Sequence, residues 1–189
     1  ARIRCYTASR AFVQFVLCII QSAILTLSYV GVAIVYGNEL PETGILTNYP
    51  MVEFYISIFL LMYAADAMGI MISCLVKKEE AANVLAPYIL IVQLIFSGIL
   101  FAMEGMADYI SYVMISRWGM EALGSIANLN DLPLKIQMTV PTVPHEFESR
   151  FDSTPEHLLT VWAVLFGFIV VFLLVGNILL HRVSKDTKG

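Results

Sequence analysis

The chain has 189 residues, of which 59% are hydrophobic and 14% charged, and its formal net charge is −4 at pH 7. Soluble domains contain about 25% charged residues and fewer apolar ones, so this composition excludes an ordinary water-soluble domain. The charges fall almost entirely outside four long apolar stretches, residues 11–36, 52–76, 81–103 and 158–180. The sequence therefore predicts an all-α fold, a polytopic membrane helical bundle.

Each of the four stretches is long enough to cross a bilayer as a helix. About 20 apolar residues, rising ~1.5 Å each, span the ~30 Å of hydrocarbon. Backbone polar groups find no water in lipid, so each span must close its own helical hydrogen bonds, and the alternating pattern of a membrane β-barrel is absent from the sequence. We expect four transmembrane helices.

The distribution of Lys and Arg predicts the orientation, because short loops rich in these residues stay cytoplasmic. Eight of the eleven flank the spans on one side: Arg2, Arg4, Arg10, Lys77, Lys78, Arg182, Lys185 and Lys188. Residues 37–50 contain none. Both termini are thus expected in the cytoplasm, with residues 37–50 and 104–157 outside a plasma (inner) membrane. The cysteines Cys5, Cys18 and Cys74 then lie in reducing or lipid surroundings and are predicted to be free thiols.

Residues 1–10 are polar and basic, and we expect them to form a cytoplasmic elbow that leads into the first span. The chain begins at Ala1 without a methionine or a cleavable leader, which indicates a piece of a longer protein. Within the first span, Gln14 and Gln21 are seven residues apart and are predicted to share a face with Ser22 and Thr26. Such side chains commonly form hydrogen bonds between membrane helices.

The second span contains a ridge of small residues and one carboxylate. Ala65, Gly69 and Ser73 repeat every four residues, a spacing that allows another helix to approach closely. Asp66 is the ionisable residue placed deep within a span. An intramembrane carboxylate is typical of an ion relay or a substrate contact, but a hydrogen bond to Gln, Ser or Thr of a neighbouring helix also accounts for it.

The third span contains Gln93, a second intramembrane polar residue. After it, residues 106–115 and 117–129 are apolar but too short to cross the membrane, so residues 104–129 are predicted to form two re-entrant or interfacial helices. Ser116 is a candidate cap for the second helix, and Arg117 a candidate interface anchor.

The remaining segment, residues 130–157, is expected to be an external loop. At its end, Thr154-Pro155-Glu156 offers a cap, a proline suited to the first helical position and an acid for the first turn. The last span is therefore predicted to begin there.

Known catalytic and metal-binding motifs are absent. The chain has no G-x-x-x-x-G-K-[ST] and no G-x-S-x-G, and its three histidines lack the spacing of metal ligands. We therefore expect no enzyme activity, metal or cofactor in this chain. The clusters of basic residues are too short to bind nucleic acid, and their role in orienting the chain in the membrane explains them better.

Two stretches resemble a known family. Ile95-Phe96-Ser97-Gly98-Ile99-Leu100 and, later, Ser116-Arg117-Trp118-Gly119-Met120-Glu121-Ala122-Leu123 are similar to the end of the fifth helix and the re-entrant segment of G-subfamily (White-type) ABC transporters. Tyr6-Thr7-Ala8-Ser9-Arg10 is similar to the entry into that family's third helix. Bacterial members with forkhead-associated and ATPase domains upstream are the nearest likeness.

The resemblance implies the last four of six helices of an ABC-2 type permease, acting as a homodimer that exports a hydrophobic or amphipathic, lipid-like or drug-like molecule. ATP and Mg would bind a nucleotide-binding ATPase domain outside this chain. The positions that match the family's functional residues fall into three groups. These are the contact with the ATPase domain (Arg4, Tyr6 and Arg10), the substrate cavity (Ile91, Leu94 and Ile95) and an apolar plug above it (Ile99 and Leu100).

Two other functions stay open at this point. Asp66 is the residue on which a secondary transporter or channel would depend, as a proton or cation site. A membrane scaffold that transports nothing is the third interpretation.

Overall fold

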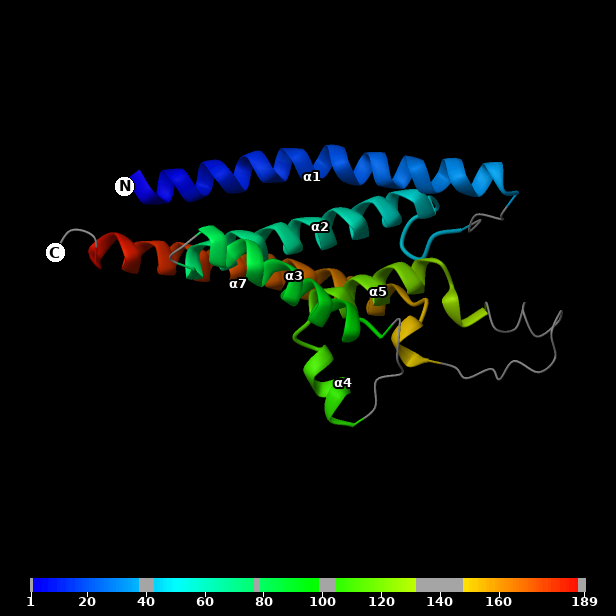
Figure 1. Cartoon of the computed structure of the whole chain (residues 1–189). Coiled ribbons are helices and arrows are strands. Elements are labelled where there is room, and N and C mark those ends of the chain that lie inside the picture. The colour runs from blue at the N-terminus through cyan, green and yellow to red at the C-terminus, as the bar shows by residue number, and fades with distance from the viewer. Residues whose placement is uncertain (1, 38–42, 77–78, 99–104, 132–147, 187–189) are drawn as a thin grey trace.

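The computed structural model describes residues 2–37, 43–76, 79–98, 105–131 and 148–186 (Figure 1). Within these ranges the chain forms helices and turns and no strand, which confirms the predicted all-α class. The longer helices are α1 (Arg2–Val35), α2 (Pro50–Leu75), α3 (Glu79–Ile95), α5 (Ile115–Ile126) and α7 (Pro155–Asp186). Shorter elements are α4 (Met106–Ser111) and the 3-10 turns η1 (Leu129–Asp131) and η2 (Ser149–Phe151).

Among the residues that the structure describes, three helices are long and apolar enough to cross a membrane: Ser9–Val35 of α1, Pro50–Leu75 of α2 and Pro155–Leu180 of α7. The apolar part of α3, Asn83–Ile95, is shorter. The helix predicted over residues 81–103 ends at Ile95, and Gly98 soon after has a φ of +81°, a left-handed conformation that does not continue a helix. Residues 99–104 lie outside the described part of the chain.

The helix α7 begins where the sequence predicts. Pro155 is its first residue, Glu156 lies in its first turn, and the Leu158 amide donates to the carbonyl oxygen of Thr154 over 3.1 Å. This helix packs along α2 and α5. The core that the three helices share includes Phe54, Ala64, Ile115, Ala122, Ile126, Leu158, Val161, Leu165 and Ile169.

The two termini lie at the same end of the bundle, as Figure 1 shows. Residues 2–10, predicted to form an elbow, are the first turns of the continuous helix α1. With 34 residues at ~1.5 Å per residue, α1 is about 50 Å long and exceeds the ~30 Å of hydrocarbon. One end of α1 therefore extends beyond the apolar layer, and that this end is cytoplasmic stays a prediction.

A narrow stripe of small and polar residues joins α1 to the bundle. Cys18, Ser22 and Thr26 are buried, at every fourth position, and Gln14 before them is half-buried. Gln21, predicted to share the face of Gln14, is exposed. The buried stripe follows every fourth residue, and each step of four residues rotates it by ~40° around the helix axis. Gln21, seven residues after Gln14, is rotated slightly the other way and therefore lies outside the stripe.

A buried carboxylate fixes the loop that precedes α2. Glu53 is 0% exposed, and its oxygens accept the backbone N–H groups of Ile45, Leu46 and Thr47 over 2.9, 2.7 and 2.6 Å. Gly44 leaves room for this arrangement, since a Cβ there would lie 2.6 Å from Glu53 Oε1. Glu53 thus holds the loop against the start of α2.

Replacing this carboxylate should destabilise the domain. Glu53→Ala leaves three backbone N–H groups without their acceptor, at a cost of about 1–3 kcal/mol for each one that stays buried. We expect a lower melting temperature of the protein in detergent. Glu156→Ala removes an exposed carboxylate from the first turn of α7 and is the control. Equal melting temperatures for the two variants would contradict the role of Glu53.

Candidate functional site

The residues predicted to line a substrate cavity share one face of α3. Ile91, Leu94 and Ile95 are spaced i, i+3, i+4 and are 53%, 49% and 39% exposed. Val84 and Tyr88, 61% and 63% exposed, extend the same face toward the start of the helix. We call these five residues the α3 stripe. The described part of the chain leaves the stripe uncovered.

Gln93 lies on the opposite side of α3 and anchors it. Its Oε1 accepts the backbone N–H and the hydroxyl of Ser116, each over 3.0 Å, and its Nε2 lies 3.8 Å from Met68 Sδ on α2. Ser116 also donates to the backbone carbonyl of Gln93. Apolar side chains gain little by facing a helix instead of lipid, so this polar contact decides which face of α3 turns outward.

The same contact corrects the expected role of Ser116. The N-cap position of α5 is Met114, where no side chain makes a capping hydrogen bond. The helix begins at Ile115, two residues earlier than a Ser116 cap requires, and Ser116 is its second residue. Its hydroxyl bridges to α3 instead.

The predicted plug residues, Ile99 and Leu100, lie outside the described residues, and their role stays a prediction. The backbone that leads to them is described as far as Gly98. A Cβ at Gly98 would lie 2.8 Å from Nη1 of Arg150, so this arginine approaches the backbone closely.

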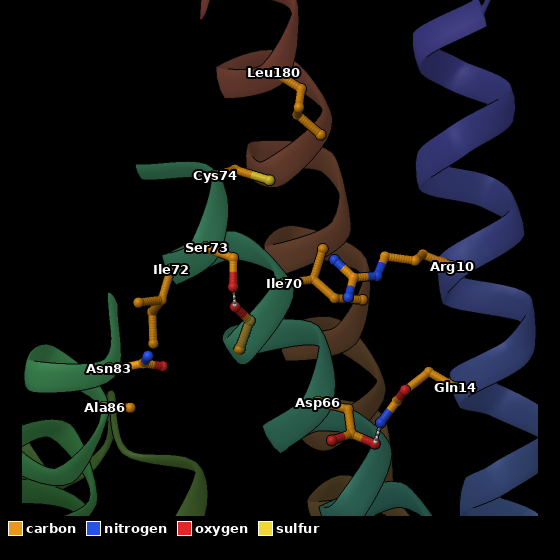
Figure 2. A pocket seen from close by; sticks show the side chains of 11 residues that line it. Arg10, Gln14, Asp66, Ile70, Ile72, Ser73, Cys74, Asn83, Ala86 and Leu180 are labelled. Carbon is orange, nitrogen blue, oxygen red and sulfur yellow. Dashed lines mark hydrogen bonds between the residues drawn. The ribbon is translucent and has the colours of Figure 1, made fainter. Parts of the chain in front are cut away.

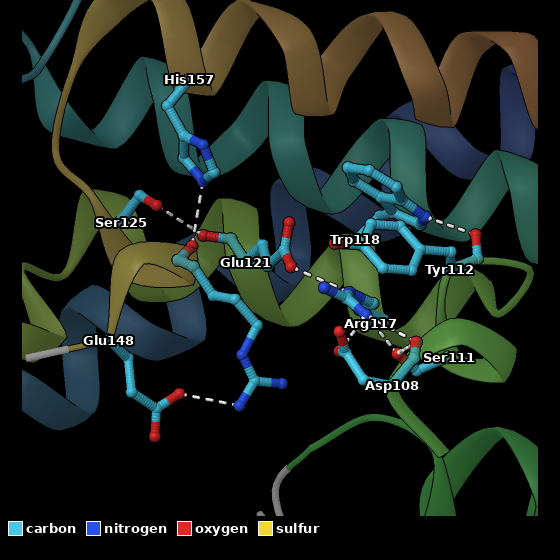
Figure 3. A network of polar contacts seen from close by, with 10 residues as sticks. Asp108, Ser111, Tyr112, Arg117, Trp118, Glu121, Ser125, Glu148 and His157 are labelled. Atoms are coloured by element: carbon cyan, nitrogen blue, oxygen red, sulfur yellow. Dashed lines mark hydrogen bonds and ion pairs between the residues drawn. The ribbon is translucent and has the colours of Figure 1, made fainter. Parts of the chain in front are cut away.

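A buried ion cluster joins α4 to α5 (Figure 3). Arg117 is 3% exposed. Its Nη1 lies 2.7 Å from Asp108 Oδ1 and its Nε 3.0 Å from Glu121 Oε1, while Ser111 accepts a further hydrogen bond. The guanidinium carbon also lies 3.6 Å from the centroid of the Tyr112 ring. The expectation that Arg117 is an interface anchor is wrong, because these partners hold it inside the protein.

Burial and pairing act against each other in this cluster. Burial raises the pKa of Glu121, and the hydrogen bond and charge of Arg117 offset this only in part. For Arg117, burial acts to lower the pKa, but the hydrogen bonds and charges of Glu121 and Asp108 outweigh it and the pKa is raised. The guanidinium therefore remains a cation, and the protein around it depends on both carboxylates.

Asp66 receives two hydrogen bonds from α1, of which Figure 2 shows the one from Gln14. Gln14 Nε2 donates to its Oδ2 over 2.7 Å and Cys18 Sγ over 2.9 Å. This is the hydrogen-bonded arrangement that tolerates a carboxylate inside a membrane protein. A role of Asp66 in ion transport is untested and stays a prediction.

The three residues predicted to contact an ATPase domain all lie on α1. Arg10 is exposed, and its side chain points into the space between α1 and α2 (Figure 2). The side chains of Arg4 and Tyr6 lie outside the described part. Their contact with another domain stays a prediction.

Sequence reasoning offered a Gln as a partner of Asp66, as found for Gln14, but missed the partners of the other buried polar residues. The i,i+4 spacing of Arg117 and Glu121 was a usable signal for that pair. Neither the loop around Glu53 nor the bridge from Gln93 to Ser116 has such a local signature. Among the residues that the structure describes, no group of three His, Cys, Asp or Glu side chains could hold a metal ion.

Breaking the ion cluster should unfold α4 and α5 more easily. Arg117→Ala leaves Glu121 buried without its cation, and breaking a buried pair costs about 3–5 kcal/mol. The comparison variant is Arg150→Ala, which removes the single ion-pair partner of the half-exposed Glu148 and should cost less, because Glu148 remains accessible to water whereas Glu121 does not. Melting temperatures in detergent give the comparison, and a smaller loss for Arg117→Ala than for Arg150→Ala would refute the importance of the cluster.

Comparison with known proteins agrees with this architecture. The ABC-2 type transporter family matches residues 2–127, more than half of the chain. The chain is also 28% identical over 174 residues to the ABC transporter ATP-binding/permease protein Rv1747 of Mycobacterium tuberculosis. That match covers 88% of this chain and 18% of the relative. No solved structure matches. We conclude that the chain belongs to the ABC-2 type transporter family and is a membrane permease domain of an ABC transporter.

Proposed function

We propose that this domain is the translocation part of an ATP-driven exporter of hydrophobic or amphipathic, lipid-like or drug-like molecules. The observation that supports the proposal is the α3 stripe. Its large apolar side chains form a wall that the described chain leaves uncovered, while Gln93 fixes the opposite face of the helix. Family membership and the ATP-binding/permease name of the mycobacterial relative support the coupling to ATP.

The chemistry of the stripe favours this class of substrate. Burial of apolar surface contributes about 25 cal/mol per Å², so a wall of Val, Ile and Leu with one Tyr binds flat or amphipathic molecules by shape and contact area. A polar nutrient would lose hydrogen bonds to water there without replacing them. The Tyr88 hydroxyl is the one polar side-chain group of the stripe.

Two copies would complete the cavity. A stripe on a single helix is one wall, and a two-fold axis parallel to the membrane normal would place a second, identical wall opposite it. Ile99 and Leu100, which follow the stripe in the sequence, would then close the cavity as a plug on the side away from the termini.

The energy would come from a nucleotide-binding domain that binds ATP and Mg outside this chain. Arg4 and Tyr6 lie in the first turns of α1, which would extend beyond the apolar layer, where such a domain could press, and Arg10 lies one turn further along, at the edge of that layer. Because α1 is continuous from Arg2 to Val35, a push on its first turns would move the whole helix as a rigid body. The alternative, secondary transport through Asp66, needs no ATP.

Transport of an amphipathic fluorescent dye by the full-length protein in proteoliposomes tests the proposal. Leu94→Asn places an amide without a partner in the apolar wall, and we expect dye transport to fall about tenfold, since an unpaired buried amide costs ~1–3 kcal/mol. Leu27→Asn changes a residue on the lipid-exposed side of α1, 71% exposed, and is the control.

Two results would overturn the proposal. Dye transport by Leu94→Asn at the level of the control would remove the stripe from the pathway. Transport that continues without ATP and stops when a protonophore is added would favour the alternative that depends on Asp66.

A further inference from the structure

A pocket of about 490 Å³ lies between α1, α2, α3 and α7, toward the end of the bundle that holds both termini (Figure 2). Its polar lining comes from Arg10, Gln14, Asp66, Ser73 and Asn83, and the other residues that line it are apolar or small. Asn83 and Ala86 line it from α3, and none of the five stripe residues does. The pocket is thus separate from the proposed substrate wall.

Residues from four helices place the opening of the pocket at the edge of the apolar layer. Arg10 immediately precedes the apolar stretch 11–36, Asn83 lies near the start of the stretch 81–103, and Leu180 is the last residue of the stretch 158–180. Cys74 lies two residues before the end of the stretch 52–76. The pocket thus lies where four apolar stretches begin or end, which marks the boundary between hydrocarbon and headgroups, where phospholipids carry their phosphates.

Arg10 supplies a cation without a partner at this level. No hydrogen bond or ion pair joins its guanidinium to any residue that the structure describes. Figure 2 shows the guanidinium pointing toward α2, beside Ile70. A guanidinium has five N–H donors in a planar fork that matches two oxygens of a phosphate.

The neighbours of Arg10 limit where an anion can lie. The amide of Asn83 is exposed and lines the pocket from α3, on the far side of α2 from Arg10 (Figure 2). Deeper in the pocket, Asp66 carries a carboxylate whose Oδ2 already accepts hydrogen bonds from Gln14 and Cys18. Repulsion from Asp66 keeps an anion near Arg10, at the mouth of the pocket.

We propose that this pocket binds the phosphate of an anionic phospholipid from the leaflet on the side of the termini. The headgroup phosphate pairs with Arg10, and the acyl chains run along the exposed apolar residues that follow on the same side of α1, of which Val13 is 53% and Leu17 43% exposed. Pockets with a basic residue between membrane helices are suited to such headgroups. A free phosphate ion would make the same polar contacts without the apolar ones, so the lipid is the better ligand.

Native mass spectrometry of the full-length protein, purified in detergent and mixed with phosphatidylglycerol, tests this site. We expect Arg10→Gln to lower the fraction of protein with bound phosphatidylglycerol about fivefold, the effect of one cation at a membrane surface. Arg10→Lys should keep most of the binding. Arg4→Gln, which removes the same charge six residues earlier on α1, is the matched control and should bind like the wild type.

A second variant tests the pocket without touching the charge. A Cβ at Gly69 would meet no atom within 4 Å, so Gly69→Leu can fill the pocket from α2 without displacing described residues. We expect this variant, too, to lose bound phosphatidylglycerol, with an unchanged melting temperature in lipid-free detergent. Retention by Arg10→Gln or by Gly69→Leu at the wild-type level would overturn the proposal. Inorganic phosphate that displaces the lipid at equal concentration would show a site for a soluble anion and would also overturn it.

Discussion

In a bilayer an apolar side chain gains little by facing another helix instead of lipid, so polar contacts decide which face of each helix turns inward. The described helices each depend on such a contact. Asp66 of α2 accepts hydrogen bonds from α1, Trp162 of α7 donates to Ser57 of α2 over 2.8 Å, and Gln93 links α3 to Ser116 of α5. The outward direction of the α3 stripe follows from the last of these contacts. Its apolar residues alone would not fix it.

The same constraint explains where charge is found inside the protein. Glu53 and Arg117 are both almost fully buried, and each has several partners, backbone amides for the first and two carboxylates for the second. Removing the partners of either residue leaves a buried charge without compensation. The resulting loss of folding free energy is larger than the net stabilisation that the intact pair gives. In contrast, Arg10 has no partner among the described residues, and the buried Oδ1 of Asn177 accepts no described hydrogen bond. Both lie toward the end of the bundle that holds the termini.

Much of the fold follows from local sequence, because span length and helix caps are local properties. The helix start at Pro155 and the shared face of Ile91 and Leu94 are examples of this. The end of α3 was not predictable from hydropathy, since the sequence stays apolar beyond Ile95 and only the positive φ of Gly98 stops the helix. The partner of Gln93 was not predictable either, because it lies 23 residues away on another helix.

The hydrogen bonds of Gln93 turn the α3 stripe away from its own bundle, and we propose that the stripe faces a second copy. Cross-linking between copies in native membranes tests it most directly, in a protein whose cysteines Cys5, Cys18 and Cys74 are replaced by serine. With a short thiol cross-linker, we expect Ile91→Cys on the stripe to give covalent dimers and Ile89→Cys, at a half-buried position of the same helix, to give none. Dimers from Ile89→Cys and none from Ile91→Cys would contradict the claim.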